Sequence, residues 1–197
     1  MHDPPRATPW TAIREGSGQS TLYHDLAEEL DALLRGETDP VANAANTAAA
    51  IYHSLPDLNW VGFYFVRGQE LVLGPFQGKP ACVRIPLGKG VCGTAAAERR
   101  SVLVADVHAF PGHIACDAAS RSELVVPLLA KAGLSDAGVL GVLDLDSPLP
   151  GRFDATDQAG CEVIAAVLMR HLSADQLPQA DRVACSVLNC RAAPRAL

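Results

Sequence analysis

The sequence predicts an antiparallel α+β fold, in which the helices before and after a run of strands cover one face of a single sheet. Helical periodicity is concentrated near the two ends of the sequence. The β-branched and aromatic runs between them follow one another mostly as meanders, without the regular strand and helix alternation of a parallel sheet. The opposite face is then left for a long loop, which we expect to cover a small pocket.

The helices are predicted from apolar spacing and from capping residues. Leu22, Leu26, Leu30 and Leu33 recur at helical spacing in the first, and Asp39-Pro40 opens an alanine-rich second helix that ends at Pro56 and Asp57. A short helix is expected over 91–99 and a final one from about 154 to 171. We divide the chain into an N-terminal extension (1–20), one domain (21–172) and a C-terminal tail (173–197). The tail forms either one further helical turn or irregular structure.

The strands are predicted from runs of Val, Ile, Leu, Phe and Tyr. NWVGFYFVRGQELVLGPF indicates a hairpin that turns at Arg67-Gly68-Gln69, and further short strands are expected over 82–85 and 102–105. ELVVPLL and GVLGVLDLDSP are typical of central strands, and KAGLSDA connects them. The segment HAFPGHIACDAASRS has no periodicity, which indicates a functional loop.

Composition and charge limit the functions that this chain can have. Its 197 residues suit one domain, and 49% hydrophobic and 19% charged residues predict a folded core. The net charge of −6, without a Lys or Arg block, argues against nucleic acid and anionic membranes as partners. The apolar runs fall short of the ~20 residues that a membrane-spanning helix needs. MHDPPRATPW lacks a secretory pattern, so we expect a cytoplasmic protein with six reduced cysteines.

The cysteines are the first candidates for chemistry. Cys116 lies in the long loop, where backbone amides can stabilise a thiolate, so it is the candidate nucleophile. Cys161 lies among apolar residues of the final helix and is expected in the core. A zinc site is disfavoured because no closely spaced C-x₂₋₄-C pair occurs.

Acidic and aromatic residues form two further sets. Glu123 opens one strand, while Asp144 and Asp146 share one face of another because side chains alternate along a strand. They are either solvated strand ends, especially Asp146, or groups that hold a ligand amine or donate a proton. Trp60 and Tyr64 also share one face, either as core residues or as the wall of a ligand pocket.

NWVGFYF, GPFQGKPACVRIPLGKGVCGTAA, VADVHAFPGHIACDAASRSELVVPL and GVLDLDSP together resemble free methionine-(R)-sulfoxide reductases, which are GAF-domain proteins. The similarity runs from about the first helix to about His171. It implies a six-stranded antiparallel GAF sheet, a homodimer, no metal or bound organic cofactor, and electrons from thioredoxin. The extended N-terminus, KAGLSDA and the tail that bears Cys185 and Cys190 depart from the family pattern.

The resemblance also implies roles for individual residues. Cys116 resembles the catalytic thiolate, Cys82 its resolving partner and Cys92 a third cysteine that could resolve instead. Trp60 and Tyr64 resemble the wall around the substrate methyl group. Glu123, Asp144 and Asp146 resemble the acidic set that holds the amino group and protonates the sulfoxide oxygen. The amides of Ile114, Ala115 and Cys116 would bind the substrate carboxylate.

Two other functions remain open from the sequence. GAF domains also serve as sensory modules that bind small ligands without turnover. A bond between Cys82 and Cys116 could likewise report oxidation without any substrate. A loop thiol together with an acidic cluster favours the reductase, because a sulfoxide becomes electrophilic when an acid protonates its oxygen.

Overall fold

The computed structural model describes residues 18–112, 117–129 and 138–172. Its sheet is antiparallel and has the strand order β3-β2-β1-β6-β5-β4. The strands are β1 (Trp60–Arg67), β2 (Glu70–Gly78), β3 (Arg84–Pro86), β4 (Val102–Val104), β5 (Ser122–Leu129) and β6 (Val139–Ser147). The helices are α1 (Gln19–Leu33), α2 (Pro40–Ser54), α3 (Gly90–Glu98), the short 3-10 helix η2 (Val107–Ala109) and α4 (Ala155–His171).

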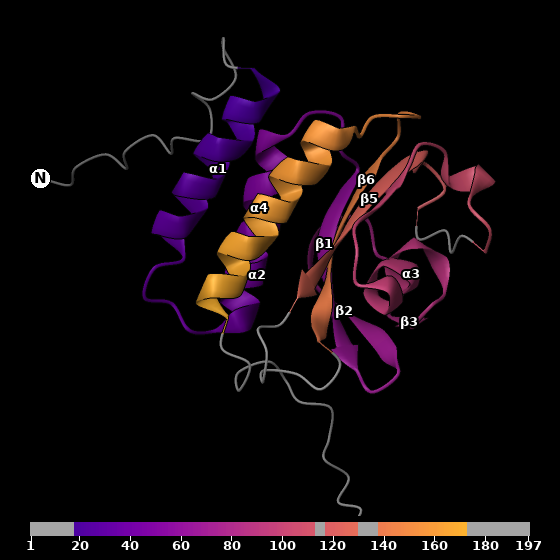
Figure 1. Ribbon diagram of the computed structural model, residues 1–197, viewed down its shortest axis with the longest axis horizontal. Coiled ribbons are helices and arrows are strands. Elements are labelled where there is room, and N and C mark those ends of the chain that lie inside the picture. The colour runs from indigo at the N-terminus through magenta and orange to yellow at the C-terminus, as the bar shows by residue number, and fades with distance from the viewer. Residues whose placement is uncertain (1–17, 113–116, 130–137, 173–197) are drawn as a thin grey trace, which may run out of the picture.

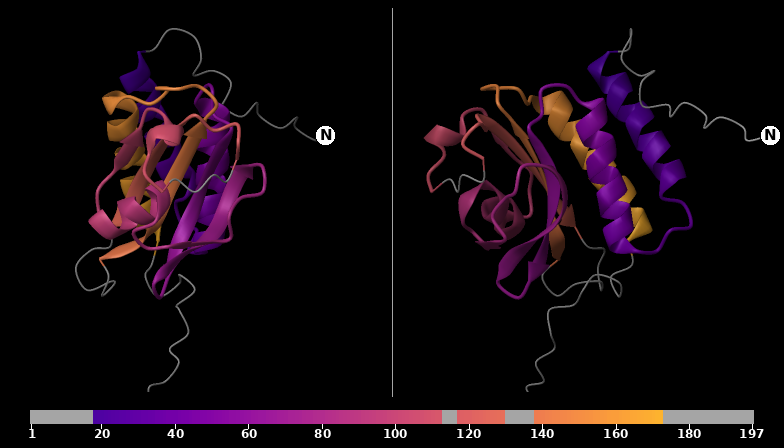
Figure 2. Two further views of the ribbon diagram at one scale, coloured as in Figure 1. Left: turned by 90° about the vertical axis from the view of Figure 1, so that its right-hand side faces the viewer. Right: turned by 180° about the vertical axis from the view of Figure 1, so that it is seen from behind.

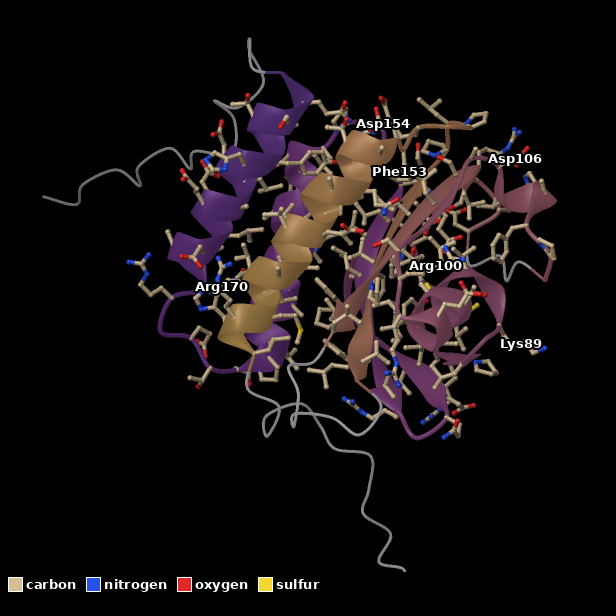
Figure 3. The ribbon with its side chains drawn as sticks, viewed as in Figure 1. Lys89, Arg100, Asp106, Phe153, Asp154 and Arg170 are labelled. Atoms are coloured by element: carbon tan, nitrogen blue, oxygen red, sulfur yellow. The ribbon has the colours of Figure 1, made fainter. Side chains whose placement is uncertain are left out.

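The sheet separates two layers of helices (Figures 1 and 2). Helices α1, α2 and α4 lie together on one side, as expected for the helices before and after the strands, whereas α3 lies on the other side. Lys89 at the start of α3 and Asp106 at the start of the long loop are on the opposite side of the sheet from Arg170 of α4 (Figure 3). The face opposite the main core therefore carries one helix as well as described parts of the long loop.

Local sequence signals place the helix starts correctly. The Asp39 carboxylate accepts hydrogen bonds from the amides of Val41 (2.8 Å) and Ala42 (2.9 Å), so it caps α2 as predicted. Asp154 and Asp157 form a reciprocal capping box at the start of α4. The spacing was misleading at the end of α1, where Leu33 is 47% exposed while the next residue, Leu34, is buried.

The predicted hairpin is confirmed, whereas the third strand differs from its prediction. The β1–β2 hairpin turns over Gly68-Gln69, with Arg67 paired to Glu70 and Gly68 in the left-handed region at φ 62°. The third strand is shorter than expected, because β3 begins at Arg84 and pairs with only three residues of β2. Cys82 therefore precedes this strand instead of lying in it. The connection predicted over KAGLSDA lies outside the described residues.

The main core fills the space between the sheet and α1, α2 and α4. Alternate residues of β1, β5 and β6 contribute Val61, Phe63, Phe65, Leu124, Val126, Leu128, Leu143 and Leu145. Cys161 is fully buried in this cluster, which confirms its assignment to the core. Among the described residues no helix combines the length and the apolar character that crossing a membrane requires.

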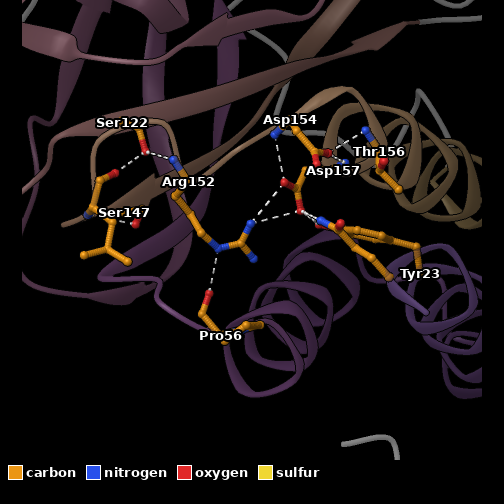
Figure 4. A network of polar contacts seen from close by, with 10 residues as sticks. Tyr23, Pro56, Ser122, Ser147, Arg152, Asp154, Thr156 and Asp157 are labelled. Carbon is orange, nitrogen blue, oxygen red and sulfur yellow. Dashed lines mark hydrogen bonds and ion pairs between the residues drawn. The ribbon is translucent and has the colours of Figure 1, made fainter. Parts of the chain in front are cut away.

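A buried ion pair holds the helical layer together (Figure 4). Arg152 Nη1 donates to both carboxylate oxygens of Asp157, at 3.1 and 3.0 Å, and the Tyr23 hydroxyl of α1 donates to the same group at 2.6 Å. Arg152 Nε also donates to the carbonyl of Pro56, which follows α2. This network joins α1, the end of α2 and α4 at one point.

Candidate active site

Strand register brings the predicted acidic and aromatic residues to the face opposite the main core. Trp60 of β1 and Glu123 of β5 both pair with Asp146 of β6, one from each side. Two residues earlier in β6, Asp144 pairs with Gly62 and Val125. Because neighbouring strands lie about 4.8 Å apart, three acids from two adjacent strands are held next to an indole ring.

The acidic set, which we define as Glu123, Asp144 and Asp146, is buried. These residues are 5%, 6% and 8% exposed, so the interpretation of the two aspartates as solvated strand ends is wrong. The Cys92 thiol of α3 lies 3.9 Å from Glu123 Oε1. Asp144 Oδ1 is buried and has no hydrogen-bond partner within the described ranges. An unpaired buried carboxyl oxygen is costly, which indicates a site prepared for a ligand.

Burial raises the pKa of every member of the acidic set. The pKa of Asp144 is raised from 3.8 to about 7, because burial outweighs the hydrogen bonds from Cys92 and Glu123. Burial first, and then the charges of the neighbouring aspartates, raise the pKa of Glu123 well above its usual range. The pKa of Asp146 is raised in the same way by burial and by Asp144. The set therefore retains protons at neutral pH and can act as an acid.

The same geometry provides a possible cation site. One donor atom each from Cys92, Glu123 and Asp144 lie within 4.8 Å of one another, and a thiol with two carboxylates can ligate a divalent ion. Spacing in the sequence did not reveal this set, because its members come from α3, β5 and β6. The donor atoms are shared with the acidic set, so a cation there would compete with any ligand amine.

Three stacked rings form an aromatic wall beside the acids. The Trp60 ring stacks against Tyr64 at 5.9 Å and against Phe76 at 5.4 Å between centroids. Gly62 permits this arrangement, since a Cβ atom there would lie 2.4 Å from both the Trp60 ring and the Phe76 Cβ. Sequence reasoning missed Phe76, although it pairs with Gly62 and so shares its face.

The thiols of Cys92 and Cys82 belong to the apolar cluster that includes the aromatic wall. Cys92 is buried in it and Cys82 is half-buried at its edge. Burial, followed by the charges of Asp144 and Glu123, raises the pKa of the Cys92 thiol well above its usual value, so Cys92 is protonated. Val107 of η2 and Phe110 of the long loop also pack onto this cluster, as expected for a loop that covers this face. Ile114, Ala115 and Cys116 lie outside the described residues.

The raised pKa of Asp144 predicts a pH-dependent stability. A group whose folded pKa exceeds its unfolded pKa stabilises the fold fully below the unfolded pKa and loses this effect as pH rises through the folded pKa, here about 7. We expect the free energy of unfolding to fall by about 1 kcal/mol between pH 6 and pH 8 from this group. Urea unfolding of Asp144→Asn should lack this decrease, whereas Asp106→Asn, which changes a half-exposed carboxylate with a lowered pKa, should keep it. Equal pH slopes in all three proteins would contradict the prediction.

Comparison with known proteins places this architecture in a family. A GAF domain model matches residues 29–172. A free methionine-R-sulfoxide reductase of Escherichia coli is 50% identical over 155 residues, which cover 79% of this chain and 91% of that protein.

Solved structures agree with this match. The structure of free methionine-R-sulfoxide reductase from Neisseria meningitidis in complex with its substrate is 44% identical, with a TM-score of 0.75 over 82% of this chain and 95% of that one. A putative GAF sensor protein from Burkholderia vietnamiensis is 56% identical, with a TM-score of 0.75 over 81% and 99%. The predicted six-stranded antiparallel GAF sheet is thus confirmed. The chain belongs to the GAF-domain family of free methionine-R-sulfoxide reductases.

Proposed function

We propose that this protein reduces free L-methionine (R)-S-oxide to L-methionine. The observation that carries this function is the buried acidic set of Glu123, Asp144 and Asp146 beside the Trp60 ring. Reduction of a sulfoxide requires a proton donor at its oxygen, and selection of a free amino acid requires an acceptor for its ammonium group. One buried cluster with raised pKa values supplies both.

Substrate binding divides the acids between two tasks. A bound ammonium favours ionisation of the carboxyl group nearest to it, and the other members of the set keep their protons because burial disfavours further charge. The aromatic wall of Trp60, Tyr64 and Phe76 accommodates the methyl group and the sulfur. The amides of Ile114, Ala115 and Cys116 bind the carboxylate. A methionine sulfoxide inside a polypeptide has no free ammonium and is excluded.

The reaction follows thiol chemistry. The Cys116 thiolate attacks the sulfoxide sulfur while an acid of the set protonates its oxygen, and that oxygen ends on Cys116 as a sulfenic acid while methionine leaves. A second thiol then attacks the sulfenic acid, which releases water and forms a disulfide. Thioredoxin restores both thiols by disulfide exchange, so turnover requires no bound metal or organic cofactor. We propose that the enzyme works in the cytoplasm and forms a homodimer. Sedimentation equilibrium tests the oligomeric state.

The second thiol is Cys82. A resolving thiol must ionise to attack, and burial next to two acids keeps Cys92 protonated. Cys82 is half-buried at the edge of the cluster and is not enclosed in this way. We therefore assign Cys92 to the acidic pocket and not to the recycling step.

Single substitutions separate the two cysteines. We expect Cys82→Ser to release one methionine per chain at the normal rate and to lose at least about tenfold in thioredoxin-dependent turnover, because its sulfenic acid lacks the fast resolver. In Cys92→Ser the ratio of thioredoxin-dependent turnover to single-turnover methionine release should stay within about twofold of the wild-type ratio, because Cys92 contacts the acidic set and does not resolve the sulfenic acid. Methionine release and NADPH consumption measure the two steps. The reverse ranking of the two variants would assign resolution to Cys92.

The function itself is tested by stereochemistry and by the form of the substrate. Consumption of NADPH with thioredoxin and its reductase should depend on the free R epimer and not on the S epimer or on a peptide that contains methionine sulfoxide. The similarity to a putative GAF sensor protein keeps one alternative, a module that binds a ligand or senses oxidation without turnover. Such a module would release no methionine from either epimer.

A further inference from the structure

A polar network connects the chain next to Cys116 with the acidic set and the aromatic wall. We name the Asp117 latch the side chains of Asn59, Lys79, Asp117 and Ser120, which come from the start of β1, the end of β2 and the long loop. None of them was a candidate from the sequence. This role rests on the proposed function, since it concerns the position of the attacking thiol.

Asp117 is the centre of the latch. Its carboxylate accepts hydrogen bonds from the Ala119 amide (2.9 Å), from Lys79 Nζ (3.3 Å) and from Asn59 Nδ2 (3.3 Å). The side chain is only 10% exposed. These contacts lower the pKa of Asp117, the Ala119 amide most, so the carboxylate is ionised. Three donors, one from the loop itself and two from the segments next to β1 and β2, thus fix the residue that follows Cys116 directly in the chain.

The other end of the latch reaches the acidic set. Asn59 Nδ2 also donates to Ser120 Oγ at 3.0 Å, and the Ser120 hydroxyl hydrogen-bonds to Asp146. The Asn59 amide donates to the Asp146 carbonyl at 3.1 Å. Lys79 contacts the aromatic wall, because its carbonyl accepts from Trp60 Nε1 at 3.0 Å. One connected set of hydrogen bonds therefore links Asp117, the acid Asp146 and the indole.

We propose that Asn59 and Asp117 are positioning residues, which fix the chain directly after Cys116 relative to the acidic set and the aromatic wall and so set the rate of the attack by Cys116. Peptide geometry supports this role, since residues 116 and 117 share a planar peptide bond and fixing one limits the other. Attack and proton transfer occur in one step, and a displacement of about 1 Å can cost about a hundredfold in rate. Lys79 contributes less, because its side chain is 70% exposed and the ion pair is screened by salt.

The test measures methionine release without a reductant, as a function of the concentration of free methionine R-sulfoxide. The amplitude reports how much protein is folded and competent, the half-saturating concentration reports binding, and the saturated rate constant reports alignment. Asp117→Asn, Asn59→Ala and the double variant are compared with the wild type. Asp106→Asn is the matched control, because Asp106 also accepts from a loop amide, that of His108 at 3.1 Å, near the start of the same loop.

We expect Asp117→Asn and Asn59→Ala each to lower the saturated rate constant about 10- to 100-fold, with amplitude and half-saturation within about twofold of the wild type. The saturated rate constant of the double variant should be no lower than that of the slower single variant, because both substitutions break the same connection. Asp106→Asn should match the wild type. If Asp117→Asn and Asn59→Ala kept rate constants within twofold of the wild type, or lost only amplitude, the positioning role would be overturned. The proposed function would not be affected. A wild-type protein that releases no methionine would overturn the proposed function and this role with it.

Discussion

Replacing Cys116 with serine should abolish methionine release, with a loss of at least about a thousandfold in the single-turnover rate constant. The attacking atom must be an anion near neutral pH, and a serine hydroxyl remains protonated where a loop thiol ionises. The sulfoxide oxygen also needs a sulfur acceptor that can be reduced again, which serine does not provide. The measurement is methionine formed from the free R epimer after rapid mixing, without a reductant.

Cys185→Ser and Cys190→Ser provide the matched controls for this prediction. They make the same chemical change in the C-terminal tail, so they should release methionine at the wild-type rate. A dimedone-type reagent should trap a sulfenic acid on Cys116 in the Cys82→Ser protein and on no residue in Cys116→Ser. Release at the normal rate by Cys116→Ser would assign the attack to another thiol and would overturn the proposed mechanism.

The parts of the fold that depend on neighbouring residues could be predicted from the sequence. Asp39-Pro40 gave the start of α2 because capping involves only the next few amides. Period-two alternation placed Trp60 with Tyr64, and Asp144 with Asp146, each pair on one face. Errors occurred where longer-range contacts decide. Leu34 packs into the core instead of Leu33, and β3 is limited by its few partners in β2.

The candidate site could be predicted only in part for the same reason. The composition of GVLDLDSP suggested acids near a strand end, but their burial depends on α3 and the long loop, which pack over that face. Nothing local indicates that Cys92 lies 3.9 Å from Glu123, since 31 residues separate them. The contact between Lys79 and Asp117 spans 38 residues and involves a side chain that looks like an ordinary surface lysine. The packing of α3 and of the long loop against the sheet brings these groups together.

Glu123→Gln should lower the saturated rate of methionine release about 100- to 10,000-fold, the usual contribution of a general acid. Burial and the charges of Asp144 and Asp146 raise the pKa of Glu123, so the wild-type side chain carries the proton that the sulfoxide oxygen needs. Glutamine keeps the size and a hydrogen-bond donor but cannot transfer a proton. Binding should weaken less than the rate, because Asp144 and Asp146 remain to hold the ammonium group.

A matched substitution separates this chemistry from packing. Glu70→Gln makes the same change in the same sheet, on a side chain that is 42% exposed and paired with Arg84 at 3.1 Å, and it should leave the rate within twofold of the wild type. Loss of the acid also predicts a different pH response. The wild-type rate should fall at alkaline pH as the acidic set loses its protons, whereas the residual Glu123→Gln rate should lack the part of this decrease that belongs to Glu123. A folded Glu123→Gln protein with a normal rate would show that another group protonates the oxygen, and Asp144, with a pKa of about 7, would then be the donor to test.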